Sequence, residues 1–84
     1  MLFRSERAAT LAPDGRWIAY QSDESGRDEI YVRPFPKTED GRWQVTTNGG
    51  QEPLWSHSGR EIFFRAPSGE IGRASCRERV YVLV

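Results

Sequence analysis

The sequence has only one cysteine and one histidine among its 84 residues, and it has no long apolar run. A single cysteine excludes an internal disulfide framework and a zinc site built from several cysteines. No apolar stretch approaches the roughly 18 residues that indicate a membrane-spanning helix. The apolar start of the chain is also too short for the core of a signal peptide, so the sequence does not mark a location.

The chain also has no excess of charge of either sign. Twelve basic residues balance twelve acidic ones, and their scatter along the sequence argues against binding to nucleic acid or to an anionic membrane. With no long apolar run either, we expect no membrane insertion. A hydrophobic fraction of 37% is typical of a globular protein rather than a disordered one. Because a chain of this length buries little of its apolar surface, we expect it to gain stability from neighbouring structure.

The sequence repeats itself once, with a shift of 44 residues. Residues 11–20, LAPDGRWIAY, align with residues 55–64, WSHSGREIFF, so that a glycine, an arginine, an isoleucine and a final aromatic residue coincide. A four-stranded blade of a β-propeller needs roughly 40 to 45 residues. The repeat therefore predicts an all-β protein whose units stack against one another.

Turn residues precede the aligned strand in both copies. Pro13, Asp14 and Gly15 supply a fixed φ, a side chain that caps its own turn and a residue that tolerates positive φ. The second copy keeps Gly59 but has His-Ser in place of Pro-Asp, which predicts a looser turn. Apolar or alternating segments predict strands at residues 8–11, 16–22, 29–33, 42–46, 52–55 and 61–65.

Both faces of the segment 16–22 are apolar. Ile18 and Tyr20 share one face, and Trp17 and Ala19 share the other. A strand of this kind is covered on two sides, whereas the alternation in the third and fourth predicted strands indicates half exposure. Stacked sheets require this change from inner strands that are apolar on both faces to outer strands that are half exposed.

These strands predict antiparallel four-stranded β-propeller blades, about one and a half of them. We expect the first blade at about residues 8–47 and the start of the next at about 52–70. The strand pattern breaks there, and residues 71–80 resemble the translation of a common sequencing adapter. We therefore predict that residues 71–84 are a non-native tail, and we assign no redox role to Cys76. The alternative is a natural strand and loop that ends in a β-prone run.

Several segments resemble the TolB-type propeller repeat, whose motif is Ser-Pro-Asp-Gly. They are APDGRWIAY at 12–20, Ser22-Asp23 and IYV at 30–32. Others resemble in particular the propellers that follow the kinase domain in many bacterial serine/threonine kinases: RPFP at 33–36, GRWQV at 41–45, Gly49-Gly50 and Trp55-Ser56. The resemblance covers most of residues 8–67, although Ala12 stands where the repeat usually has serine.

The resemblance implies a parent propeller that serves as a sensor, a ligand-binding platform or a protein-interaction platform. It also implies a bacterial periplasmic or extracytoplasmic location. The implied partners are the remaining propeller blades of the parent chain, with a protein or small ligand at the loop face. The following residues form the structural repeat motif: Pro13, Asp14, Gly15, Arg16, Trp17, Ile18, Tyr20, Trp55, Gly59, Arg60, Ile62 and Phe64.

No catalytic, metal or cofactor site is predicted. His57 lies between two serines, but neighbouring side chains on a tight turn point apart, and a lone histidine lacks metal-binding partners. The acidic loop 23–29 lacks the ligand pattern of a calcium loop and carries Arg27, so we expect it to be solvated. The three tryptophans lie on predicted strands, which favours core or interface positions over ligand platforms.

Two functions remain open from the sequence. The first is a non-catalytic propeller fragment that acts as a protein-interaction or ligand-sensing scaffold of a larger bacterial protein. The alternative is the propeller part of a prolyl-oligopeptidase-type serine peptidase. The chain has neither the kinase motifs nor a Gly-x-Ser-x-Gly segment, so we do not expect it to be an enzyme by itself.

Overall fold

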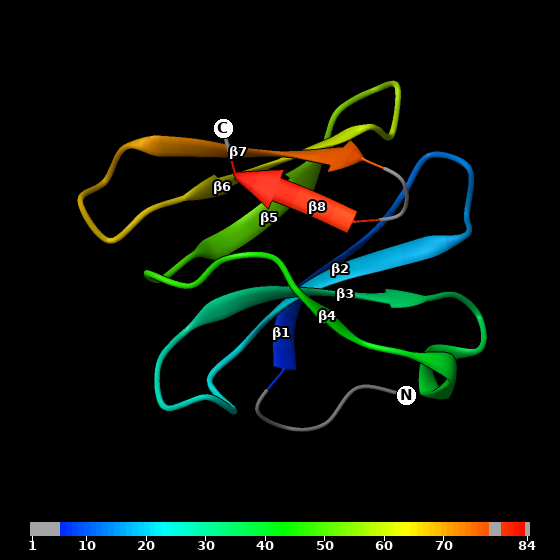
Figure 1. The fold of residues 1–84 in the computed structure, drawn as a ribbon, viewed down its shortest axis with the longest axis horizontal. Helices are drawn as coiled ribbons and strands as arrows, with labels where there is room; N and C mark the ends of the chain where they lie inside the picture. The colour runs from blue at the N-terminus through cyan, green and yellow to red at the C-terminus, as the bar shows by residue number, and fades with distance from the viewer. Residues whose placement is uncertain (1–5, 78–79, 84) are drawn as a thin grey trace.

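Two antiparallel sheets of four strands each make up the described part of the chain, residues 6–77 and 80–83 of a computed structural model. The first sheet contains β1 (Glu6–Leu11), β2 (Trp17–Ser22), β3 (Glu29–Pro34) and β4 (Trp43–Gln44), with a short 3-10 turn, η1 (Thr38–Asp40), before β4. The second contains β5 (Gln51–Trp55), β6 (Glu61–Arg65), β7 (Ile71–Arg77) and β8 (Val80–Leu83). Figure 1 shows the two sheets one above the other. The all-β class predicted from the sequence is confirmed.

All six segments predicted as strands contain strands in the structure. Within each sheet, each strand pairs with the next one along the chain, as short connections favour. The fourth strand is shorter than predicted, because only Trp43 and Gln44 pair with β3. Beyond this pair the Thr46 hydroxyl accepts a hydrogen bond from the Ile30 N–H at 2.9 Å, so a side chain there takes a ladder position.

The second sheet is completed by residues that the sequence predicted to be a tail. β7 pairs with β6 from Glu61 opposite Ser75 to Arg65 opposite Ile71, and β8 pairs with β7. The chain therefore forms two four-stranded sheets rather than about one and a half. The physical reason is that β6 would otherwise leave an edge of unpaired backbone groups, which a β-prone segment can satisfy. The adapter origin concerns the gene and stays a prediction, and the Cys76 side chain lies outside the described residues.

The two sheets share one backbone conformation at the 44-residue shift. Ala8 and Glu52 have φ of 54° and 53°, and each lies where the register shifts in the first strand of its sheet. Gly15 and Gly59 have φ of 74° and 75°. A positive φ at a residue other than glycine is uncommon, so its occurrence at the same place in both copies is not a general property of hairpins. The sequence repeat is therefore a structural repeat.

The hydrophobic core lies between the two sheets. Its buried members are Ala12, Ala19, Ile30, Val32, Val45, Trp55, Ile62, Phe64 and Ala74. Two hydrogen bonds cross the same interface. The Trp55 indole N–H donates to the Thr10 carbonyl at 2.9 Å, and the Glu52 N–H donates to the Gln21 side-chain oxygen at 3.0 Å.

The outer face of the first sheet is covered by its own side chains. Tyr20 and Tyr31 are stacked there, with ring centroids 5.7 Å apart, and both are buried. The Arg33 guanidinium lies over the Tyr20 ring and donates to the Tyr20 hydroxyl at 2.8 Å, while Arg42 lies over Tyr31. Since Ala19 on the opposite face is buried as well, the prediction that both faces of this strand are covered is confirmed. The half exposure predicted for the third strand is wrong, because residues 29–32 of β3 are buried on both faces.

Candidate functional site

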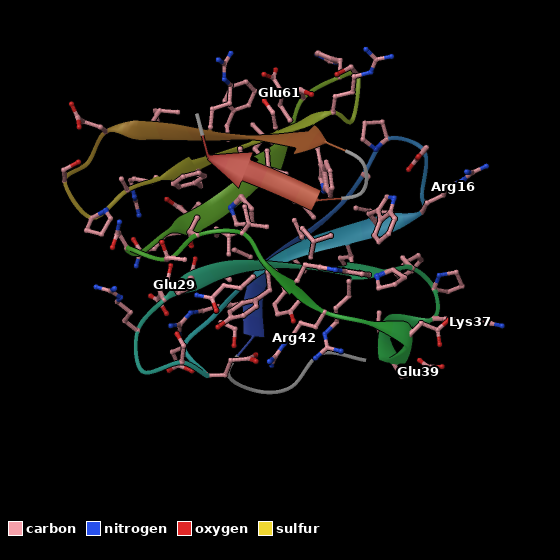
Figure 2. The ribbon with its side chains drawn as sticks, viewed as in Figure 1. Arg16, Glu29, Lys37, Glu39, Arg42 and Glu61 are labelled. Carbon is pink, nitrogen blue, oxygen red and sulfur yellow. The ribbon has the colours of Figure 1, made fainter. Side chains whose placement is uncertain are left out.

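The connections between strands gather at two opposite ends of the molecule (Figure 1). The turn end holds the turns at residues 12–16 and 56–60. The loop end holds the connections at residues 23–28, 47–50 and 66–70. Figure 2 labels Arg16 at the turn end and Glu29 at the loop end.

The two turns of the repeat motif are closed by the same hydrogen bonds. The glycine N–H donates to the carbonyl three residues earlier, at 2.9 Å for Gly15 and 3.0 Å for Gly59. The side chain before each glycine accepts from the N–H two residues later, at 3.0 Å for Asp14 and 3.2 Å for Ser58. Serine thus replaces the carboxylate without changing the turn, and the looser second turn predicted from the sequence is not observed.

The remaining motif residues divide between surface and core. Pro13, Arg16 and Arg60 are exposed. Trp55, Ile62 and Phe64 lie in the core between the sheets, and Trp17 packs against it. Ile18 is half-buried and Tyr20 is buried, both in β2 of the first sheet. The structure therefore brings the motif residues together as turns and core, not as a cluster of reactive groups.

His57 is exposed on the second turn, between two serines whose hydroxyls accept hydrogen bonds from backbone N–H groups. The hydroxyls of Ser56 and Ser58 lie 3.1 Å apart and form a hydrogen bond with each other, and Ser56 also accepts from the Glu61 N–H at 3.2 Å. Within the described residues, no group of three or more His, Cys, Asp or Glu side chains could hold a metal ion. The same residues include no helix long and apolar enough to cross a membrane.

Asp28 joins the two repeats at the loop end. Its carboxylate accepts hydrogen bonds from the Arg7 guanidinium and from the Gln51 side-chain amide, both at 2.9 Å. Arg7 and Gln51 are equivalent positions, 44 residues apart, near the starts of β1 and β5. The hydrogen bond from Gln51, supported by the bond and charge of Arg7, holds the pKa of Asp28 below its ordinary value of 3.8, although burial opposes this shift. A single carboxylate therefore bonds the same position in both copies.

Glu29 fixes the connection between the two sheets. Its side chain is only 2% exposed, and one carboxylate oxygen accepts from the Thr46 hydroxyl at 2.5 Å and from the Gly49 N–H at 2.9 Å. The other oxygen accepts from the Arg27 guanidinium at 3.1 Å. A buried carboxylate is costly unless it is paired and hydrogen-bonded, and these three donors satisfy that requirement.

A cleft of about 440 Å³ opens beside these acids at the loop end. It is lined by Arg27, Asp28, Gly49, Gly50, Gln51 and Pro67, and so by connections from both repeats. The Arg27 side chain is more than half exposed and donates to the Thr47 carbonyl at 2.8 Å. The cleft offers hydrogen-bonding groups to a polar ligand, but its lining includes no nucleophile with an adjacent base.

The outer face of the second sheet is apolar and open. Leu54 and Phe63 lie opposite each other on β5 and β6, Leu54 is 62% exposed, and Ile71 on β7 is 71% exposed. In the first sheet the equivalent positions are Thr10 and Ala19, which also pair with each other. Ala19 is completely buried beneath the second sheet. The first sheet buries this face under the second sheet, whereas the second sheet exposes the equivalent face to solvent.

Comparisons with known proteins identify no family for this chain. A scan against protein-family models gives no match, and a search of curated proteins finds no relative. The function is therefore inferred from the geometry of the turn end, the loop end and the open sheet face.

The sequence did not indicate the acid cluster at the loop end. The prediction of a solvated loop holds for residues 23–27, which are exposed, but Asp28 is partly buried and Glu29 is buried. The available signal was an acid directly before the apolar run at residues 30–32, because a charge at the start of a buried strand needs partners. Apart from Arg27, those partners lie between 17 and 23 residues away along the chain.

Proposed function

We propose that the chain is part of a β-propeller and serves as a non-catalytic scaffold for protein interaction or ligand sensing in a larger bacterial protein. The observation that carries the proposal is the difference between two equivalent residues. Ala19 is fully buried under the second sheet, whereas Phe63 is only half-buried. In an array of stacked repeats each unit buries this face under the next one, so the second sheet has a place for a third.

Charged pairs frame the open face without covering it. Arg65 pairs with Glu52 at 2.7 Å, and Arg73 pairs with Glu61 at 3.3 Å. Because these charges are matched within the sheet, the apolar strip around Leu54 does not call for a charged partner. A further sheet packed about 10 Å away would suit such a surface.

The loop end supports a binding role for the intact assembly. The cleft there is built from connections of both repeats, and binding residues in proteins commonly lie on loops that a rigid scaffold positions. The partners in this proposal are the further propeller units and a protein or small ligand at the loop end. Function in such a scaffold depends on these loops rather than on the strands.

Replacing Leu54 by lysine tests the open face. We expect the wild-type chain to associate as its concentration rises, since an exposed apolar sheet face without its neighbour favours contact between copies. Leu54→Lys should abolish this association in sedimentation measurements while the near-ultraviolet circular dichroism stays unchanged. Leu11→Lys is the matched control, because Leu11 is also exposed but lies outside this face. A monomeric wild type, or equal effects of the two variants, would contradict the proposal.

The DNA on both sides of the coding segment separates the proposed function from its alternative. Further copies of the turn and strand at a spacing near 44 residues are expected, and their absence would refute the propeller assignment. A kinase glycine-rich loop upstream would favour the scaffold, whereas a Gly-x-Ser-x-Gly segment downstream would favour the peptidase. The same DNA would decide whether residues 71–84 derive from an adapter.

A further inference from the structure

Asn48 is the only asparagine of the chain, and it directly precedes Gly49 in the connection between the two sheets. An asparagine followed by glycine is chemically prone to deamidation, because glycine has no Cβ to hinder attack by its backbone nitrogen. The Gly49 nitrogen loses its proton and bonds to Asn48 Cγ, and the carboxamide C–N bond breaks. Ammonia leaves with the transferred proton, and a cyclic succinimide remains. Water then opens the ring to an aspartate or an isoaspartate.

In the folded chain the attacking nitrogen is held in a hydrogen bond. The Gly49 N–H donates to the buried Glu29 carboxylate at 2.9 Å. Deprotonation of an amide beside a carboxylate is disfavoured, because two negative charges would then lie next to each other in a poorly hydrated site. The hydrogen bond also fixes the direction of the N–H, so the nitrogen cannot turn toward the Asn48 side chain.

Packing immobilises the same peptide from the other side. Gly49 has φ of 95°, and a Cβ built on it would lie 2.5 Å from the Pro67 ring, so its Cα is pressed against the neighbouring connection. Asn48 itself is exposed, and water and buffer base reach its carboxamide. The reaction is therefore limited by movement of the Gly49 peptide and not by access of solvent.

We propose that Asn48 is a covalent modification site whose reactivity Glu29 controls. The site is inert while the Gly49 N–H is bonded to Glu29, and it reacts when the connection between the sheets opens locally. Local opening of this kind requires far less free energy than global unfolding. The rate of deamidation therefore reports on the opening of this connection alone. The proposal holds whatever larger protein the chain serves.

The product would change the connection between the repeats. An isoaspartate adds a backbone carbon in a segment where Gly50 packs against Ile30 and its N–H donates to the Asp28 carbonyl at 3.0 Å. Either product also places a new carboxylate at residue 48, directly before the glycine whose N–H binds Glu29. The isoaspartate product therefore cannot restore the hydrogen bonds of the Gly49 and Gly50 N–H groups, and we expect it to loosen the contact between the sheets.

Mass spectrometry of the 84-residue chain tests the proposal, since its single asparagine makes the site unambiguous. Wild type in native buffer should deamidate at least about tenfold more slowly than a peptide of residues 44–52. Glu29→Ala should raise the rate about ten- to a hundredfold, which is the population change expected when a hydrogen bond to a charged group is lost. Asn48→Gln should remove the reaction and serves as the negative control.

Ile62→Val separates local opening from general unfolding. This change weakens the core between the sheets but leaves Gly49 and Glu29 untouched. The two variants are compared in denaturant concentrations that give them equal folded fractions. Faster deamidation of Glu29→Ala under these conditions supports the proposal. Equal rates of the two variants, or a wild-type rate equal to that of the peptide, overturn it.

Discussion

Replacing Ile62 by alanine should destabilise the chain far more than the same change at Ile18. The two isoleucines are equivalent positions of the repeat, but Ile62 is fully buried between the sheets, whereas Ile18 is half-buried on the outer face of the first sheet. Because sequence position and strand context match, the pair isolates the effect of burial. The comparison therefore measures how strongly the two sheets hold each other.

The expected magnitudes follow from burial. Truncation of a buried isoleucine to alanine costs about 2 to 5 kcal/mol, which includes the cavity left behind. At the half-buried Ile18 the loss should be about 1 kcal/mol, because less apolar surface returns to water. A domain of this size has a total stability of about 4 to 12 kcal/mol. Ile62→Ala therefore removes a large share of the stability, and Ile18→Ala removes little.

Urea unfolding followed by tryptophan fluorescence measures both changes, since Trp55 lies in the interface between the sheets. We expect the Ile62→Ala midpoint to fall well below that of Ile18→Ala, or the variant to be unfolded without urea. Equal losses at the two positions would refute the reasoning, because they would mean that the sheets do not pack against each other in solution.

Two further predictions concern the loop end. The pKa of Asp28 is lowered in the folded chain by Gln51 and Arg7, so this carboxylate stabilises the fold above about pH 4 and the contribution is lost as the pH falls through the folded value. In urea melts at several pH values, Asp28→Asn should reduce the loss of unfolding free energy at acid pH. An unchanged loss would show that the hydrogen bonds to Asp28 do not stabilise the fold. Gly49→Ala should cost about 1 to 3 kcal/mol more than Gly26→Ala in urea melts, because both glycines have positive φ but only at 49 would the new Cβ meet the Pro67 ring. Similar losses for the two variants would contradict this close contact.

The turns and strands could be predicted because their causes are local. Gly15 and Gly59 provide the positive φ of each turn, and the alternation around Ile18 and Tyr20 sets the faces of β2. The 44-residue period indicated two copies of one unit, and the backbone angles of the copies agree. The prediction of a looser second turn is wrong, because the Ser58 hydroxyl accepts the same hydrogen bond from the turn as the Asp14 carboxylate.

Other features depend on contacts between distant parts of the chain. β7 forms because β6 offers it an unpaired edge, and β8 then pairs with β7, whereas their own sequence indicated only a β-prone run. Asp28 is partly buried and Glu29 is buried because Gln51, Thr46 and Gly49 reach them from the connection between the sheets. The sequence alone determined the repeat, the positions of its turns and the all-β class, since these follow from neighbouring residues. Only the tertiary structure decided that the outer face of the second sheet is open and which acids are paired, because burial depends on what folds against a residue and not on what precedes it.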